Sequence, residues 1–219
     1  MAATPTLPVI VNAGGGAARR AGAGLAESIE AAFAEAGQAI ALELVDGKDL
    51  SAAFARHADA PRLVAGGGDG TLAAAAAARM RCDGELAILP LGTLNHFARE
   101  IGIPADLRQA AALAAGGAAR PVDIACAGER VFINNLSVGA YVDLVRAREA
   151  SSLPKFVATV PAAWRTLRKL RARSFDLTSD GDRCQITTPL LFVGNNRYQL
   201  DEGRPAERAA LDDGLLSLY

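Results

Sequence analysis

The amino-terminal half of the chain alternates short apolar segments with longer helical ones, and this order constrains the fold more than any other feature. The helical segments repeat apolar residues every three or four positions, whereas the shorter runs have strand length. The expected strands are Leu7–Asn12, Ile40–Val45, Arg62–Ala65 and Leu86–Leu89, and the expected helices are Leu25–Ala36, Leu50–His57, Leu72–Met80, Asn95–Ile101 and Asp106–Ala115. Strand–helix alternation predicts a parallel sheet with helices on both faces.

The pattern changes near Val122, where strand follows strand and one helical stretch, Leu153–Leu170, interrupts them. Consecutive strands joined by turns are typical of an antiparallel sheet. We therefore predict two domains: an α/β domain at 1–123 and a β-rich domain at 124–219. The strands expected in the second part are Val122–Ala127, Val131–Leu136, Ser174–Ser179, Gln185–Val193 and Leu215–Tyr219.

Composition excludes several classes of protein. The net charge of −1 gives no global field that would attract nucleic acid. The three cysteines include no pair with CxxC spacing, which argues against a zinc site or a disulfide framework and favours a reducing cytoplasm. No secretory signal is evident, and no apolar run reaches the length of about 18 residues that a transmembrane helix needs.

A glycine-rich loop, Gly66-Gly67-Gly68-Asp69-Gly70-Thr71, lies between an expected strand and an expected helix. Glycines let backbone N–H groups face outward, and the following helix presents its positive end, so the loop suits phosphate. It is not a Walker A loop, because no Lys-Ser/Thr follows the glycines. A tight turn without a ligand is the structural alternative.

Asp69 is the candidate catalytic residue in this loop. A carboxylate beside phosphates is repulsive unless a cation or a transferable proton lies between them, so it indicates metal-assisted phosphoryl chemistry. Capping the helix that begins near Thr71 is a compatible structural role.

Two further loops are expected at the same sheet edge, because adjacent parallel strands bring their carboxyl ends together. One is Pro90-Leu91-Gly92-Thr93-Leu94-Asn95, in which Thr93 offers a hydroxyl and Asn95 an amide, either to a nucleotide or as helix caps. The other follows the first strand, with Asn12 and three glycines. The candidate nucleotide-binding residues are Asn12, Gly14, Gly15, Gly16, Gly66, Gly67, Gly68, Asp69, Gly70, Thr71, Leu72, Thr93 and Asn95.

Together these motifs resemble the diacylglycerol kinase catalytic-domain family. A Gly-Gly-Asp-Gly-Thr loop alone is shared with NAD kinases and sphingosine kinases, whereas the second loop and a late Asp-Asp-Gly segment are more specific. The matching segments run in order along nearly the whole chain: Asn12, Gly67–Thr71, Pro90–Arg99, Val122-Asp123, Phe132–Asn134, Ser137–Gly139, Gly194–Asn196 and Leu211–Leu215.

The resemblance implies an NAD-kinase-like α/β domain followed by a β-sandwich domain, with ATP and Mg²⁺ as cofactors and a lipid hydroxyl as phosphoryl acceptor. By position, a structural Mg²⁺ would take the carboxylate of Asp213 and the backbone carbonyls of Ala210 and Leu215, which are ligands that a hard cation prefers. Asp123 would join a hydrogen-bonded network between that metal and the active site. Because some relatives are dimers, a homodimer is among the expectations.

The end of the chain departs from the family pattern. Bacterial relatives continue for several strands and carry a late acidic segment assigned as general base, whereas this sequence stops at Tyr219 and looks like a fragment. Asp69 is then the best candidate base, since the equivalent residue of sphingosine kinases accepts the proton, whereas the resemblance to bacterial diacylglycerol kinases implies that it supports magnesium. A nucleotide-binding module without catalysis and an NAD-kinase-like enzyme are the alternatives, and the sequence does not name the lipid.

A basic amphipathic stretch is expected near the middle of the chain. Phe156, Val160 and Trp164 share one helical face, and Lys155, Arg168 and Lys169 lie beside it. Such a helix either lies on an anionic membrane surface, giving peripheral contact with the lipid substrate, or packs on the second-domain sheet with its arginines in water.

Overall fold

The computed structural model describes residues 5–139, 172–199 and 207–219. These residues form two compact units that interleave along the chain. Unit 1 takes the described parts of 1–134 and 195–215, and unit 2 takes those of 135–194 and 216–219. The predicted functional domains, 1–123 and 124–219, stay a prediction.

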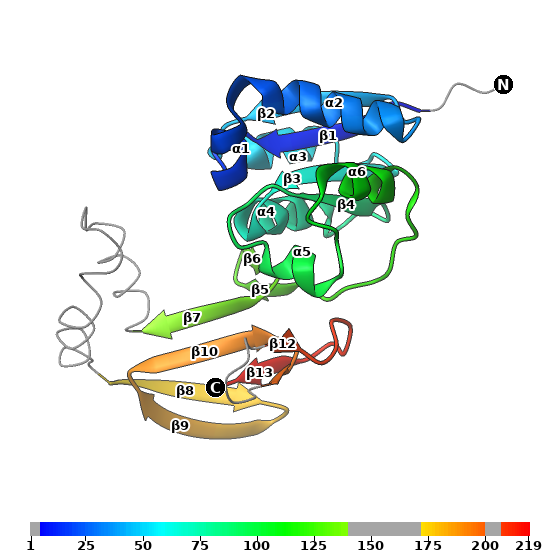
Figure 1. Cartoon of the computed structure of the whole chain (residues 1–219). Helices are drawn as coiled ribbons and strands as arrows, with labels where there is room; N and C mark the ends of the chain where they lie inside the picture. The colour runs from blue at the N-terminus through cyan, green and yellow to red at the C-terminus, as the bar shows by residue number, and fades with distance from the viewer. Residues whose placement is uncertain (1–4, 140–171, 200–206) are drawn as a thin grey trace, which may run out of the picture. The chain divides into compact units, whose positions relative to one another are not determined.

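Unit 1 is built on a four-stranded parallel sheet, as predicted. The strands are β1 (Leu7–Asn12), β2 (Ile40–Val45), β3 (Arg62–Gly67) and β4 (Glu85–Pro90), in the order β2-β1-β3-β4 (Figure 1). Val11 lies opposite Gly66, and Gly66 lies opposite Leu89, so the strands end together at one edge of the sheet. Val9–Val11 of β1 and Leu63–Ala65 of β3 are fully buried, which explains why these segments are continuous apolar runs in the sequence.

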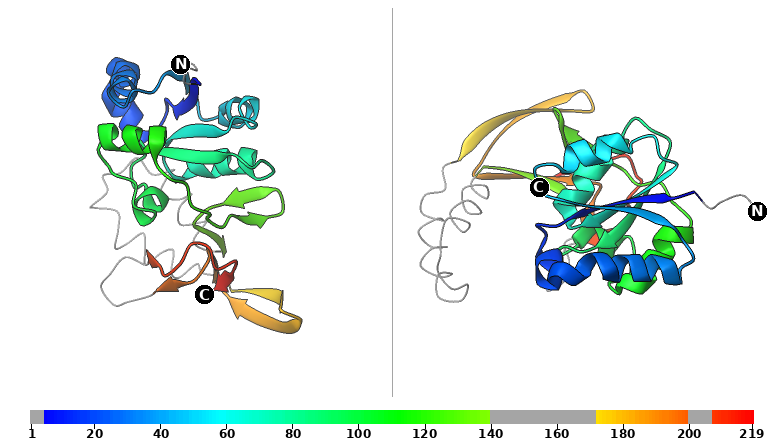
Figure 2. Two further views of the ribbon diagram at one scale, coloured as in Figure 1. Left: turned by 90° about the vertical axis from the view of Figure 1, so that its right-hand side faces the viewer. Right: turned by 90° about the horizontal axis from the view of Figure 1, so that it is seen from above.

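Helices cover both faces of this sheet, and Figure 2 shows the strands between two helical layers. One layer contains α2 (Leu25–Glu35) and α6 (Leu107–Gly116), which pack around the buried Phe33. The other contains α3 (Leu50–Arg56), α4 (Asp69–Arg79) and α5 (His96–Glu100), which pack around Phe54 and Leu72. Two short elements follow β1 that the sequence did not predict, α1 (Gly16–Ala21) and the 3₁₀ turn Gly22–Gly24.

The strand order creates a switch point between β1 and β3. The chain leaves β1 toward one side of the sheet to reach β2, and it leaves β3 toward the other side to reach β4. In open α/β sheets, ligands bind outside the carboxyl ends of the strands at such a point. Asn12 and Gly67 are the last residues of the two strands that flank it.

An ion-pair cluster joins α3 to the edge strand β2. Glu43 accepts a hydrogen bond from Arg56, and one of its carboxylate oxygens lies 2.6 Å from His57 Nε2. The hydrogen bond with His57 lowers the pKa of Glu43, burial opposes this shift, and Arg56 adds a further lowering through its hydrogen bond and charge. The glutamate side chain is 31% exposed, so solvent screens these interactions.

The lowered pKa predicts a pH-dependent contribution of Glu43 to stability. A depressed folded-state pKa stabilises the fold above the unfolded pKa, and the contribution disappears as pH falls through the folded value. We therefore expect Glu43→Gln to lower the free energy of unfolding at pH 7 by at most about 1 kcal/mol. Urea denaturation of both proteins between pH 7 and pH 3 should show the difference vanishing in acid. Glu30→Gln, at an exposed position on α2, is the control and should change neither curve.

Antiparallel strands follow the parallel sheet, in agreement with the predicted fold class. In unit 1, β5 (Ala125–Ala127) pairs with β6 (Arg130–Phe132), and β11 (Tyr198–Gln199) pairs with β12 (Glu207–Arg208). In unit 2, β7 (Asn135–Gly139), β10 (Leu190–Asn195) and β13 (Leu216–Leu218) form one sheet, and β8 (Arg173–Ser179) and β9 (Asp182–Thr188) form a hairpin.

Two expected strands are each divided in the structure. Val131–Leu136 becomes β6 and β7, which belong to different sheets, and Gln185–Val193 becomes β9 and β10. Pro189 lies at the second division, where its missing N–H cannot continue a ladder. At the first division the chain passes from unit 1 to unit 2 after Asn134. The pattern of apolar residues alone does not show where the chain passes from one unit to the other.

The predicted amphipathic helix Leu153–Leu170, with its proposed membrane contact, lies outside the described residues. Among the helices that are described, none has the length and apolar character needed to cross a bilayer.

Candidate functional site

Three loops meet at the carboxyl edge of the parallel sheet, as expected from the sequence. The loop after β1 is joined to the loop after β3 by a hydrogen bond from Asn12 Nδ2 to Thr71 Oγ1, at 3.1 Å. Asn12 Oδ1 accepts the backbone N–H of Gly14, at 3.0 Å, so its whole amide is used in shaping the first loop. Asn12 and Thr71 therefore fasten two loops across the switch point.

The loops after β3 and β4 are in direct backbone contact. A Cβ atom placed on Gly92 would lie 2.3 Å from the Cα of Gly68, and one placed on Gly67 would lie 2.4 Å from the hydroxyl of Thr71. Only glycine leaves room for this approach. These glycines therefore have a structural role, whether or not they also make room for a ligand. We call the surface formed by 12–16, 66–72 and 90–95 the cradle.

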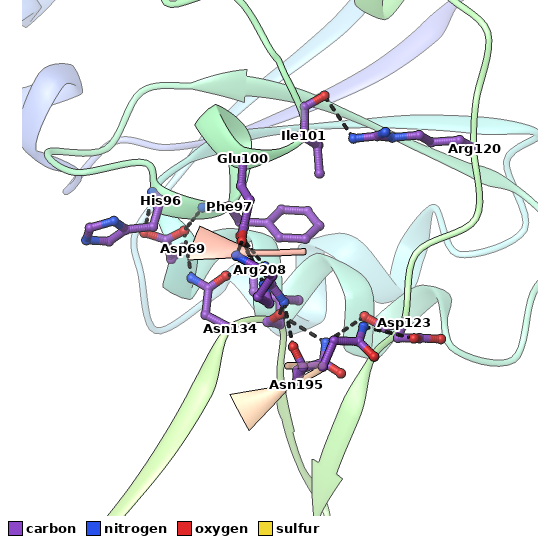
Figure 3. Close-up of polar contacts among 12 residues, drawn as sticks. Asp69, His96, Phe97, Glu100, Ile101, Arg120, Asp123, Asn134, Asn195 and Arg208 are labelled. Atoms are coloured by element: carbon purple, nitrogen blue, oxygen red, sulfur yellow. Dashed lines mark hydrogen bonds and ion pairs between the residues drawn. The ribbon is translucent and has the colours of Figure 1, made fainter. Parts of the chain in front are cut away.

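Asp69 belongs to the second loop of the cradle, and its carboxylate is held by three donors that lie outside the cradle (Figure 3). Its Oδ1 accepts from the backbone N–H of Phe97, at 2.9 Å, and from Asn134 Nδ2, at 3.1 Å. Its Oδ2 accepts from the backbone N–H of His96, at 3.2 Å. The carboxylate therefore caps the amino terminus of α5.

The expectation that Asp69 caps its own helix is wrong. Helix α4 begins at Asp69 itself, its N-cap is Gly68, and the cap has no side-chain hydrogen bond. The backbone N–H groups that the Asp69 carboxylate accepts are instead those of His96 and Phe97, at the start of the neighbouring α5. In the first turn of α4, the N–H groups of Thr71 and Leu72 donate to the carbonyl of Gly68, while those of Asp69 and Gly70 have no acceptor among the described residues.

Asn95 neither caps α5 through its side chain nor extends into open space. It adopts a left-handed backbone conformation with φ of 50°, and its Oδ1 accepts the N–H of Gly92, at 2.8 Å. Its Nδ2 donates to the carbonyls of Pro90 and Gly92. Asn95 thus closes the 90–95 turn on itself, while Thr93 is exposed and its hydroxyl bonds to none of the described residues.

Behind Asp69 lies a buried ion pair that the sequence analysis did not single out. Arg208, on β12, bonds to Glu100, at the end of α5, with Nη2 and Oε2 2.5 Å apart. Arg208 also donates to Asn134 Oδ1, at 3.1 Å, and Asn134 in turn donates to Asp69. The two charged residues are 108 positions apart. No local pattern in the sequence could have joined them.

A second polar cluster surrounds Asp123. Its Oδ2 accepts from Asn196 Nδ2, at 2.9 Å, and from the backbone N–H of Gly214, at 2.7 Å. Asn196 is fully buried with φ of 68°, and its Oδ1 accepts the N–H of Leu215. Asn195 connects this cluster to the ion pair, since its Nδ2 donates to the carbonyl of Asp123 and its own carbonyl accepts from Arg208.

The predicted metal ligands lie on the turn that Asp123 holds. Gly214 has a φ of 68°, which allows the chain to reverse between Ala210 and Leu215. The carboxylate of Asp213 is exposed and accepts no hydrogen bond from the described residues, and the Leu215 carbonyl accepts one, from Asn196 N–H. One free carboxylate with backbone carbonyls is a donor set that fits Mg²⁺. The described side chains include no group of three or more His, Cys, Asp or Glu suited to a metal.

A cavity in the described part of unit 1 shares only Leu72 with the cradle. It has a volume of about 730 Å³ and lies beside β4, with apolar walls that include Ile88, Ile103 and Val122. Buried Arg79 contributes to its wall. None of the candidate nucleotide residues except Leu72 lines it.

The chain is similar to known proteins. The family model described as diacylglycerol kinase catalytic domain matches residues 6–127. A Pseudomonas aeruginosa protein named "Probable lipid kinase YegS-like" is 35% identical over 210 residues, covering 88% of this chain and 67% of that protein. A Pseudomonas putida protein of the same name is 34% identical, covering 71% of this chain and 54% of its own length.

The fold also matches solved structures. A crystal structure described as a diacylglycerol kinase from Bacillus anthracis str. Sterne aligns with a TM-score of 0.67 and 23% identity, over 98% of this chain and 72% of that one.

Among the relatives found by sequence, lipid kinase YegS of Escherichia coli K12 is 29% identical, and this chain spans 57% of it. The chain thus spans little more than half the length of the first curated relatives it matches. On the family model and the Pseudomonas relatives, the chain belongs to the diacylglycerol kinase catalytic-domain family.

Proposed function

We propose that this chain carries the nucleotide site of an ATP-dependent lipid kinase, which transfers the γ-phosphoryl group to the hydroxyl of a diacylglycerol-like lipid. The observation that carries the proposal is Asp69, a carboxylate fixed by three N–H donors on the glycine-rich loop that contacts both of the other loops. A simple dinucleotide site gains nothing from an anion in that place, whereas phosphoryl transfer uses a carboxylate to hold a cation or to accept the acceptor's proton.

The residues of the cradle divide into two groups. The side chains of Asn12, Thr71 and Asn95 bond within the protein, so they shape the loops. Several N–H groups of the cradle, among them those of Gly14, Gly15 and Gly92, already bond within the loops. Contacts to the phosphates of ATP would then come from N–H groups without an acceptor among the described residues, such as those of Asp69 and Gly70, with Thr93 adding its exposed hydroxyl. This division supports a site that recognises the shape and negative charge of phosphate groups, mainly through backbone N–H groups.

Asp69 is the group placed to act on the acceptor hydroxyl. Both of its oxygens are oriented by donors, and Oδ2 accepts only one of them among the described residues. A carboxylate oxygen has room for about two hydrogen bonds, so Oδ2 can still receive a proton or a cation. Mg²⁺ would be held by Asp213 with the carbonyls of Ala210 and Leu215, where it supplies positive charge that fixes this turn.

The test is transfer of radiolabel from [γ-³²P]ATP to a panel of acceptors in mixed micelles: diacylglycerol, phosphatidylglycerol and a sphingoid base, with NAD as the non-lipid acceptor. We expect radiolabel to be transferred to a lipid, and this transfer to require Mg²⁺. The acceptor that is labelled identifies the substrate class. Labelling of NAD alone would contradict the proposal. So would ATP binding without transfer to any lipid, which is the behaviour of a nucleotide-binding module.

A further inference from the structure

The guanidinium of Arg208 is buried and fully hydrogen-bonded within unit 1. Its side chain is 1% exposed. Nε and Nη2 donate to the carboxylate of Glu100, and Nη1 donates to the carbonyls of Ile133, at 2.7 Å, and Asn195, at 3.1 Å. Nη2 also donates to Asn134 Oδ1, at 3.1 Å. Arginine carries five N–H donors in one rigid plane, and each has an acceptor here, so the group cannot rotate away from Asn134.

This arrangement fixes which way the Asn134 amide faces. Arginine only donates, so it must meet the amide oxygen, and an ionised carboxylate only accepts, so Asp69 must meet the amide nitrogen. Both conditions hold, with Oδ1 toward Arg208 and Nδ2 toward Asp69. A reversed amide would set donor against donor and acceptor against acceptor. The orientation of Asn134 is therefore set by its charged neighbours.

The Asn134 amide in turn decides how the Asp69 carboxylate is turned. With Asn134 and Phe97 both donating to Oδ1, that oxygen has its two hydrogen bonds, and only His96 N–H approaches Oδ2. Without the donation from Asn134 the carboxylate is restrained by the α5 amides alone. Each oxygen then has one donor, Phe97 N–H on Oδ1 and His96 N–H on Oδ2, and neither oxygen is singled out to receive a proton or a cation.

We propose that Arg208 is a positioning residue for phosphoryl transfer: anchored by Glu100, it orients Asn134 so that Asp69 presents Oδ2 to the reacting groups. The assignment rests on the function proposed above, because it gives Arg208 a part in the work of Asp69. It also makes Glu100 the fixed end of a chain that runs from α5 through β12 to the cradle. Misplacing a catalytic group by about 1 Å can cost about 100-fold in rate, which sets the scale of the expected effect.

The first test substitutes Arg208→Lys, which keeps the positive charge beside Glu100. A lysine ammonium on a flexible stem cannot reach Glu100, Asn134 and the two carbonyls together. We expect kcat to fall about 10- to 100-fold while KM for ATP changes less than about threefold. In combination with Asn134→Ala, Arg208→Lys should lower kcat no further than Asn134→Ala does by itself. Independent effects that multiply, or an unchanged kcat, would overturn the proposal.

Two comparisons separate positioning from stability. Arg62→Lys is the matched control, since Arg62 pairs with Glu85 and donates to the carbonyls of Ala114, Ala115 and Gly117, away from the cradle. It should lower the Tm without changing kcat. If Arg208→Lys does not fold, the double variant Glu100→Met with Arg208→Met removes both charges together and leaves none buried alone. The same loss of kcat is expected there, and normal turnover in it would refute the assignment.

A readout without turnover distinguishes this inference from the proposed function. The side-chain amide signals of Asn134 can be identified in a ¹⁵N–¹H spectrum by their loss in Asn134→Asp. Both Arg208→Lys and Asp69→Asn should shift these signals, whereas Arg62→Lys should not. Unchanged chemical shifts of the Asn134 side-chain amide in Arg208→Lys would overturn the inference, whatever the activity of that variant. If the wild-type protein phosphorylates no lipid, the proposed function fails, and a shift in the spectrum would still support the hydrogen-bonded chain from Arg208 to Asp69.

Discussion

Substituting Asp69→Asn should reduce phosphoryl transfer by about 10²- to 10⁴-fold while leaving a folded protein. The amide oxygen can still accept from Phe97 N–H and Asn134 Nδ2, so most of the anchoring survives. The amide nitrogen, however, replaces Oδ2 and faces the N–H of His96. It can neither receive a proton from an acceptor hydroxyl nor bind a cation. Steady-state assays with the lipid that is labelled in the acceptor panel measure the change in kcat.

The structural cost of this substitution should be small, which makes the activity loss interpretable. One hydrogen bond is lost, at a cost of about 1 kcal/mol. Asp106→Asn is the matched control, because Asp106 also caps a helix, accepting Gln109 N–H at the start of α6. Asp106→Asn should retain wild-type turnover. Near-normal turnover by Asp69→Asn would remove Asp69 from the mechanism, and with it the case for a functional carboxylate in the glycine-rich loop.

Much of the parallel half of the fold could be predicted because its signals are local. The bounds of β1 and β2 agree with those expected from apolar run length, and α2 and α3 differ by a single residue at one end. The later strands were harder to bound. Ile133 and Asn134 continue an apolar strand pattern, yet they lie between two strands of different sheets, and this depends on contacts with distant residues such as Arg208.

The site shows the same division between local and distant information. Glycine content and position after a strand predicted that three loops would meet, and they do. The sequence could not show that Asp69 caps α5 and not α4, because the choice depends on where a neighbouring loop places its N–H groups. It also gave no sign of Glu100 and Arg208, since arginine and glutamate are most often solvated. Only their burial reveals them.

Gly92→Ala should distort the cradle more than any other glycine-to-alanine substitution in it. The new Cβ would lie 2.3 Å from the Cα of Gly68 and 2.5 Å from Asn95 Oδ1, against ordinary carbon contacts of about 3.5–4.0 Å. Both neighbours are held, Gly68 by the start of α4 and Asn95 by its bonds to Pro90 and Gly92. The β3 and β4 loops must therefore separate. Overpacking of this kind costs about 1–3 kcal/mol of stability.

The consequence for ligand binding follows from the backbone character of the site. If phosphates are bound by N–H groups of these loops, moving the loops apart by about 1 Å weakens every such contact at once, and kcat/KM for ATP should fall about 100-fold or more. Calorimetric titration with ATP and Mg²⁺ measures the lost affinity directly. Gly116→Ala is the control, because a Cβ at the end of α6 meets no atom within 4 Å, and it should bind ATP normally. Equal ATP affinity in Gly92→Ala and the wild type would show that the nucleotide does not bind at the contact between these two loops.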